Sequence, residues 1–408
     1  MSYFINLSIF RRNRNFTLLF IGQFVSFFGT MITSVALPYQ IYTETHSTMM
    51  VGLLSLFQLL PLLVTALIGG VFADRYHRRM LLLGAEFLLA IGCLLLAWNA
   101  TLLIPHIWAI FLIATLMSAM TGLHRPALDS IVQQIVAKKD FPSVSALGTF
   151  KYSLGMIAGP AVGGLIIGHF GIVVTFLSDF ATFLISLCAI LAMSHIPKPQ
   201  ASHDESTWSS LRTGFRYAFS RQELIGTYVI DFIAMIFGMP SALFPAIALS
   251  FGGPKILGLL YSAPAIGALF VSFFTGFAER VRSHGKAIAI AAVGWGVAII
   301  FFGLAPDLYI ALFFLALAGA FDAVSGIFRG IMWNETIPNH LRGRLSGIEM
   351  ISYLSGPKLG DTEAGFVAAL FGIPFSIISG GVLCVVGVMV CSYYLPRFWQ
   401  YQCEERHG

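Results

Sequence analysis

The chain has 408 residues, of which 57% are hydrophobic and 11% are charged, and its mean hydropathy is +0.83. Soluble proteins carry about a quarter charged residues, so this composition excludes a soluble globular protein and predicts one that crosses a membrane many times. The net charge of +5 does not indicate a nucleic-acid partner, because the Lys and Arg residues lie in short turns instead of forming one basic stripe.

Apolar runs long enough to cross about 30 Å of hydrocarbon recur along the chain. They predict an all-α membrane protein with twelve transmembrane helices, at approximately 16–42, 49–72, 80–100, 106–126, 142–168, 172–195, 224–250, 256–279, 286–304, 308–336, 346–370 and 372–395. Lys and Arg are concentrated in the even-numbered turns between these spans, as is typical of cytoplasmic loops. We therefore expect both termini on the cytoplasmic side.

Two features recur after about half the chain. Asp74-Arg75 returns as Glu279-Arg280 after 205 residues, and Gly159-Pro160 returns as Gly356-Pro357 after 197 residues. This period predicts two copies of one six-helix unit. We expect an N-terminal six-helix half at 1–196, a cytoplasmic linker with an interfacial helix at 197–222, and a C-terminal six-helix half with a short tail at 223–408.

The polar turn from Gly70 to Arg79 resembles the signature turn between helices two and three of the major facilitator superfamily, and the twelve spans and the half-chain repeat resemble that superfamily over the whole length. Three further segments resemble its drug:proton antiporter branch, which contains the enterobactin exporter and macrolide efflux proteins: Asp231 with Phe237–Pro240, Pro338 with Leu341–Arg344, and Gly356–Gly365. The resemblance implies a multi-pass transporter of the bacterial inner (plasma) membrane that works by alternating access.

The turns after the second and eighth spans have two interpretations, a solvated loop or a conformational latch. The resemblance favours the latch, for which the candidate residues are Gly70, Asp74, Arg75 and Arg79, with Glu279 and Arg280 as their counterparts in the second half. A carboxylate at such a turn can stabilise one closed state by facing a helix amino end or a cation.

The fifth span holds Gly155, Gly159, Pro160, Gly163 and Gly164, and three of these glycines recur every four residues. Small residues at that spacing allow close helix packing, and Pro160 weakens the local helix hydrogen bonding. The segment resembles the antiporter motif of exporters, although Ala146 stands where that motif has a glycine. An ordinary tight helix contact is the alternative, and Gly356-Pro357 is the matching packing candidate in the second half.

Charged residues inside apolar spans need a reason, because an ionised group at membrane depth costs at least about 2.5–3.5 kcal/mol unless it faces protein or water. The proton-coupling candidates are Asp231, Asp322 and Asp361, ranked with Asp231 first and Asp322 second. The substrate-binding candidates are Gln23, Thr30, Gln58, Lys151, Arg329 and Lys358. Asp322 and Arg329 lie two turns apart on one helix face, and Lys358 can pair with Asp361. Buried ion pairs that only fix helix positions remain the alternative for each residue.

We therefore predict a secondary active transporter, a proton-coupled exporter of a siderophore or amphipathic small molecule. The alternatives are an importer of a ferric siderophore or nutrient, and a polyspecific drug or macrolide efflux pump. The sequence holds no phosphate-binding Gly-Lys loop, no metalloprotease His pair and no nucleophile elbow, so we expect no enzyme activity, no cofactor and no metal. The expected partners are a small-molecule substrate, protons and the lipid bilayer, with no nucleic acid, and we expect a monomer.

Overall fold

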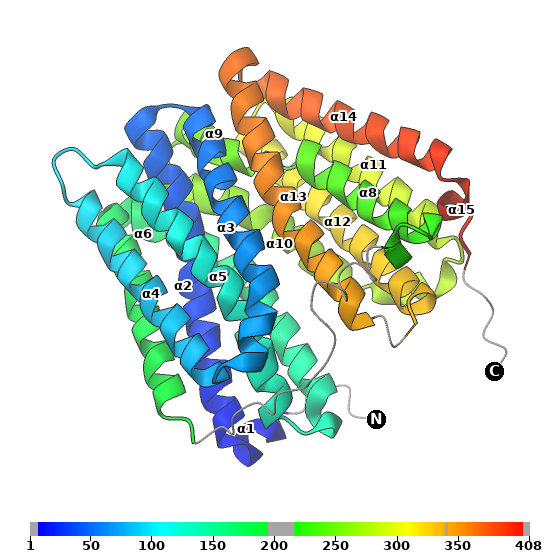
Figure 1. The fold of residues 1–408 in the computed structure, drawn as a ribbon. Helices are drawn as coiled ribbons and strands as arrows, with labels where there is room; N and C mark the ends of the chain where they lie inside the picture. The colour runs from blue at the N-terminus through cyan, green and yellow to red at the C-terminus, as the bar shows by residue number, and fades with distance from the viewer. Residues whose placement is uncertain (1–6, 195–215, 339–341, 403–408) are drawn as a thin grey trace. The chain divides into compact units, whose positions relative to one another are not determined.

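The protein is described here from a computed structural model that covers residues 7–194, 216–338 and 342–402 (Figure 1). Within these ranges the description leaves out the side chains of residues 70, 71, 73–75, 275, 277, 279, 342–344 and 346–350. The described residues form helices and connecting turns and contain no β-strand. An all-α fold is therefore confirmed for the part of the chain that the structure describes.

The chain divides into two compact units. Unit 1 consists of Met1–His46, Phe57–His203 and Ala248–Ser262, and unit 2 consists of Ser47–Leu56, Asp204–Ile247 and Ala263–Gly408. The predicted linker at 197–222 lies largely outside the described residues, and the predicted domain boundaries stay predictions.

Unit 1 is built mainly from α1 (Ser8–Arg12), α2 (Arg14–Thr45), α3 (Thr48–Arg75), α4 (Arg78–Ala100), α5 (Ile107–Ile135), η1 (Lys138–Asp140) and α6 (Phe141–Leu191). The helix α6 turns at Gly171, where φ is 83°, a value that side-chain-bearing residues rarely adopt. The predicted fifth and sixth spans lie on the two sides of this turn. The buried side chains of Leu19, Leu82, Ile131 and Ile190 join α2, α4, α5 and α6 in one apolar cluster.

Unit 2 is built mainly from α8 (Gln222–Phe237), η2 (Ser241–Leu243), η3 (Thr275–Arg280), α11 (His284–Gly303), α12 (Leu308–Thr336), α13 (Arg342–Phe371), α14 (Ile373–Tyr394) and α15 (Pro396–Trp399). The helices α9 (Phe244–Phe251) and α10 (Pro254–Ser272) each contribute residues to both units. The predicted span at 224–250 is not one regular helix, because α8 ends before Gly238 and Pro240, which cannot donate a backbone hydrogen bond, lies in the break.

Ten segments among the described residues are long and apolar enough to cross a membrane. One of them, Lys138–Leu191, contains the two predicted spans that meet at Gly171. The helix α13, which carries the predicted span at 346–370, is not among the ten and includes residues whose side chains are outside the description. The count of twelve and the cytoplasmic termini therefore stay predictions.

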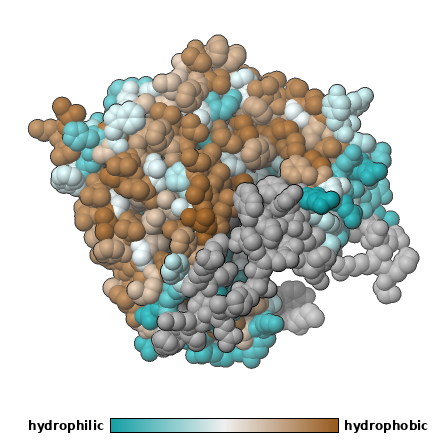
Figure 2. Space-filling model, viewed as in Figure 1, coloured by the Kyte–Doolittle hydropathy of each residue, from teal (hydrophilic) through white to brown (hydrophobic). Residues whose placement is uncertain are grey.

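Large apolar side chains are exposed along many helices, including Leu60, Trp98, Phe270, Tyr309 and Tyr393. Hydrophobic residues dominate the described part of the surface visible in Figure 2. A monomer in water rarely exposes apolar patches larger than a few hundred Å², whereas lipid tails cover such a surface without penalty. The surface thus agrees with a multi-pass membrane protein.

Candidate functional site

Unit 2 contains a cluster of three charged side chains, one cation with two carboxylates. The guanidinium of Arg329, in α12, forms an ion pair with Asp231 of α8 through its first terminal nitrogen. Its second terminal nitrogen donates a hydrogen bond to Oδ1 of Asp322 at 3.4 Å. Asp322 also belongs to α12 and lies seven positions earlier. Asp322 is the most exposed of the three side chains, at 42%, against 16% for Asp231 and 13% for Arg329. We call these residues the Arg329 cluster.

Asp361, in α13, is held mainly by hydroxyl groups. Its Oδ2 accepts a hydrogen bond from Ser55 at 3.0 Å, and its Oδ1 accepts a short one from Ser241. The charge of Lys358, one turn earlier, also acts on this carboxylate. Sequence spacing predicted that Lys358 lies beside Asp361. It did not predict the hydrogen bonds from the two serines, because they come from other parts of the chain.

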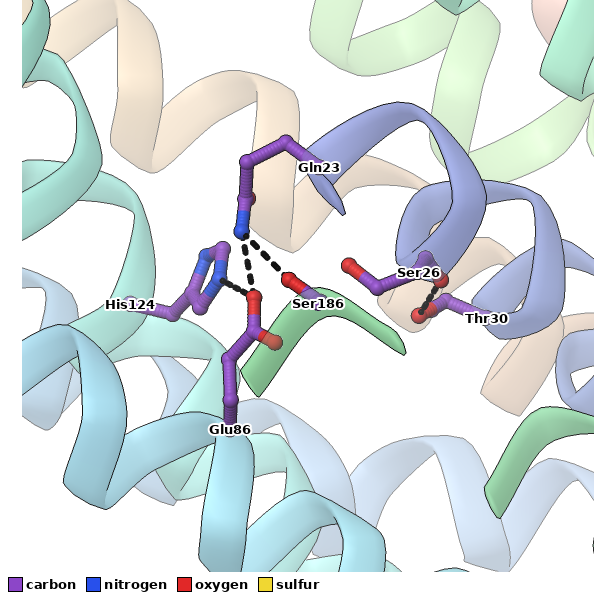
Figure 3. Close-up of polar contacts among 6 residues, drawn as sticks. All are labelled: Gln23, Ser26, Thr30, Glu86, His124 and Ser186. Atoms are coloured by element: carbon purple, nitrogen blue, oxygen red, sulfur yellow. Dashed lines mark hydrogen bonds and ion pairs between the residues drawn. The ribbon is translucent and has the colours of Figure 1, made fainter. Parts of the chain in front are cut away.

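Unit 1 contains a second polar cluster, drawn in Figure 3, around a residue that the sequence analysis did not single out. Glu86 of α4 is 0% exposed, and its Oε1 accepts a short hydrogen bond from the amide of Gln23 in α2. The imidazole Nε2 of His124, in α5, lies 3.1 Å from the same oxygen. The Gln23 amide is also 3.2 Å from the hydroxyl of Ser186 in α6. We call these four residues the Glu86 cluster.

The sequence did contain a signal for Glu86. It interrupts the apolar run of the third span, where an ionisable residue marks a buried polar partner or a functional group. His124 lies near the end of the predicted fourth span, where a lone histidine is more often an interfacial residue than a buried partner. Only the packing of α4 against α5 shows that the two side chains meet.

Three substrate-binding candidates of unit 1 make contacts within the protein. Thr30 Oγ1 donates to the backbone carbonyl of Ser26 one turn earlier, at 2.9 Å, so its hydroxyl serves its own helix (Figure 3). The carbonyl of Gln58 accepts from Ser118. Gln23 is 4% exposed and its amide is bonded within the protein, so substrate contact at Gln23 requires a different arrangement of this cluster.

Lys151 of α6 is the cationic candidate of unit 1. Its ammonium lies 5.7 Å from the ring centroid of Phe27, in α2, within the range of a cation–π interaction. The charges of Asp129 and Arg125, in α5, and of Glu86 also act on it. Lys151 therefore lies in an electrostatically coupled region that includes the Glu86 cluster.

The glycines of the fifth span face neighbouring helices closely. A methyl group added at Gly155, Gly159 or Gly163 would meet residues of α2, namely Phe27, Met31 and Ile32. A methyl group at Gly164 would lie 2.5 Å from the carbonyl oxygen of Pro254 in α10, and the carbonyl of Pro160 lies against Gly258. In unit 2, Gly356 faces Met235 in the same manner. These contacts are those of a small-residue helix interface.

The proposed latch is described only in part. The side chains of Asp74, Arg75 and Glu279, and the surroundings of Gly70, lie outside the described residues, and Arg280 is exposed. Arg79 donates to the carbonyl oxygens of Ile190 at 3.1 Å and Leu191 at 2.9 Å, and so caps the carboxyl end of α6.

A cavity of about 550 Å³ lies among α11, α14 and α15 and shares no residue with either charged cluster; it is lined by Ala289, Ile290, Val293, Val388, Met389, Ser392, Tyr393, Pro396 and Trp399. Among the described residues, no group of three His, Cys, Asp or Glu side chains is arranged to hold a metal ion.

Comparison with known proteins decides the family. Residues 6–406 match the model of the transmembrane secretion effector family. The chain belongs to this family. Its relatives include the enterobactin exporter EntS of Citrobacter koseri, which is 28% identical over 391 residues, 95% of this chain and 94% of that protein. EntS of Shigella boydii is 27% identical over the same shares of the two chains.

Solved structures show the same fold. A POT family transporter in complex with 5-aminolevulinic acid superposes with a TM-score of 0.75 at 13% identity, covering 95% of this chain and 97% of that one. The nucleoside transporter NupG gives a TM-score of 0.72 at 16% identity, covering 95% and 99%. Members of the transmembrane secretion effector family are major facilitator superfamily transporters, so this chain is a secondary transporter of the bacterial inner membrane and not an enzyme.

Proposed function

We propose that this transporter is a proton-coupled exporter of a siderophore or a similar amphipathic small molecule. The direction and the substrate class are supported by the relatives named enterobactin exporter, which match 95% of the chain at 27–28% identity. The ammonium of Lys151 beside the ring of Phe27 is a contact suited to an anionic, catechol-bearing ligand.

The proposed coupling of transport to protons rests on the Arg329 cluster. One guanidinium balances one carboxylate, so with both aspartates ionised the cluster has one excess negative charge. A single proton neutralises it, and neutrality is strongly favoured at membrane depth. Binding of one proton is therefore linked to whether the cluster is exposed to water, which is the requirement for coupling to alternating access.

The contacts favour Asp322 over Asp231 as the proton carrier, the reverse of the order expected from the sequence. Asp231 makes the close ion pair with Arg329, which favours its ionised form. Asp322 contacts the guanidinium at 3.4 Å, so its protonation gives up a weaker ion pair, and its exposed surface lets a proton reach it.

The proposal is tested in proteoliposomes of known orientation, by following efflux of a metal-free catecholate siderophore with and without an imposed pH gradient. We expect gradient-driven efflux to fall by about tenfold or more in Asp322→Asn. In this variant the charges of Arg329 and Asp231 balance, so the cluster no longer takes up a proton. Substrate exchange without a gradient is retained in that variant. The control is Asp307→Asn, which leaves the amino-terminal cap of the same helix in place.

Three other outcomes have definite meanings. Full gradient-driven efflux in both Asp322→Asn and Asp231→Asn would exclude the coupling assignment. Movement of only the ferric complex toward the cytoplasmic face would establish import. Gradient-driven export of macrolides but not of the siderophore would establish drug efflux.

A further inference from the structure

The carboxylate of Glu86 differs from that of Asp179, which is also buried in unit 1, in how its two oxygens are bonded. Asp179 accepts hydrogen bonds from Thr33 at 2.5 Å and Thr182 at 3.0 Å, so both of its oxygens have hydroxyl donors. The Oε1 atom of Glu86 contacts both the Gln23 amide and the His124 imidazole. Its Oε2 atom is buried and has no hydrogen-bond partner among the described residues. One carboxylate is fully satisfied and the other is not.

An ionised Glu86 beside a neutral imidazole is an unfavourable state. The carboxylate is 0% exposed, and a buried charge without sufficient partners is strongly disfavoured. One added proton removes the net charge, either as a carboxylic acid beside neutral histidine or as a carboxylate beside imidazolium. The contact therefore forms a pair suited to binding one proton.

Access to the pair is asymmetric. The side chain of His124 is 17% exposed, whereas that of Glu86 has no exposed surface. The imidazole is therefore the part of the pair through which a proton can reach the carboxylate. Uptake at one ring nitrogen, with transfer of the Nε2 proton to Oε1, changes only N–H and O–H bonds and takes the pair from −1 to neutral.

Other charged groups face the pair from the neighbouring helices. Lys151 and Asp179 of α6 interact electrostatically with Glu86, and Asp129 of α5 interacts with His124 and with Arg125 beside it. From α2, the uncharged amide of Gln23 contacts the pair. Movement of Lys151 toward Glu86 would favour proton release, and its withdrawal would favour uptake.

We propose that Glu86 and His124 form a proton-binding site of unit 1, separate from the Arg329 cluster, which takes up and releases one proton during the transport cycle. The inference rests on the proposed function for its role in transport, but the binding of the proton itself is independent of it. Gln23 is a positioning residue, because its amide fixes the carboxylate that the imidazole contacts.

The test is a pH titration of the full-length protein in lipid nanodiscs, followed by infrared difference spectroscopy of protonated carboxyl groups. We expect a carboxyl signal that titrates within about pH 5 to 8, is absent in Glu86→Gln and moves by about one pH unit or more in His124→Gln. The matched controls are Glu44→Gln and His169→Gln, which replace exposed residues of the same types and should leave the signal unchanged. A titrating signal that persists in Glu86→Gln would overturn the proposal, as would a Glu86 that stays in one protonation state throughout this range.

A second measurement covers the case in which Glu86→Gln does not fold. Nitrogen NMR of histidine-labelled wild-type protein, with His124 assigned through His124→Gln, should show its ring titrating over the same pH range as the carboxyl signal. A His124 ring that does not titrate together with a carboxyl group would also overturn the proposal.

Transport assays distinguish a failure of this inference from a failure of the proposed function. We expect gradient-driven efflux to fall about tenfold in Glu86→Gln while substrate exchange without a gradient is retained. If the pair titrates but the wild-type protein shows no gradient-driven export, the proposed function fails and the proton site stands. If export is proton-driven but the Glu86 signal is absent, the site is wrong and the function stands.

Discussion

At the residue scale, Arg329 is the shared partner of two carboxylates that come from different helices. Its ion pair with Asp231 is largely buried, whereas its contact with Asp322 is longer and involves a half-exposed side chain. Removing one partner of a buried pair leaves an uncompensated charge, and exposed pairs contribute little. The two contacts of the same guanidinium should therefore differ in energy.

Arg329→Gln should destabilise the protein by about 2–3 kcal/mol, somewhat below the ~3–5 kcal/mol of a fully buried pair, because Asp231 then loses its cation. The double variant Arg329→Gln/Asp231→Asn should recover most of that loss, since no buried charge remains unpaired. Asp322→Asn should cost less than about 1 kcal/mol. Unfolding in detergent, arranged as a double-mutant cycle, measures all three, and equal losses for Asp231→Asn and Asp322→Asn would contradict the ranking.

At the element scale, the glycines of α6 decide how closely α6 approaches its neighbours. Gly164 faces the backbone of α10 at Pro254 and Gly258, where no side chain can move aside. Gly148 lies in the same helix with no atom within 4 Å of the position of an added methyl group. The same substitution therefore has opposite consequences at these two sites.

Gly164→Ala should destabilise the protein by about 1–3 kcal/mol, because the added carbon forces the backbones apart. Gly148→Ala should be neutral or stabilising by up to about 1 kcal/mol, since alanine favours the helix over glycine. Thermal unfolding of the two variants in the same detergent checks the pair. A Gly164→Ala protein as stable as Gly148→Ala would show that this interface is loose.

At the scale of the whole molecule, the remaining prediction is the orientation in the membrane. The turn after α4 contains Leu103, which is fully exposed, and the turn after α5 contains the exposed Lys139. The distribution of Lys and Arg predicts that these two turns lie on opposite sides, with Lys139 in the cytoplasm.

Single cysteines introduced at Leu103 and at Lys139, in a protein whose five native cysteines are replaced, test this orientation. A membrane-impermeant thiol reagent added to intact cells should label the cysteine at 103, and should label the one at 139 only after the membrane is opened. The reverse pattern would place the termini outside, and labelling of both in intact cells would exclude the predicted helix between them as a span.

The sequence by itself determined the class of protein, because apolar runs and the placement of charges depend only on local composition. Most of the runs mark their helices to within a few residues, but α5 continues nine residues past the predicted end at 126, α10 ends seven residues before the predicted end at 279, and the run at 224–250 is broken. The turn Gly70–Arg79 with the half-chain repeat was sufficient to place the chain in its superfamily, which the match over residues 6–406 confirms. The placement of Asp322 and Arg329 on one helix face was also predictable, since both lie on one helix at a fixed period, and the structure brings them into contact.

Tertiary structure alone decided which polar groups from different helices meet. Asp231 and Arg329 are 98 residues apart, and Glu86 and His124 are 38 apart, so no sequence period relates them. Asp361 lies next to Lys358 in sequence, yet its carboxylate is bonded to Ser55 and Ser241. Local periodicity fixes the face of one helix on which a residue lies. The side chain that it meets depends on which helices pack together and at what depth.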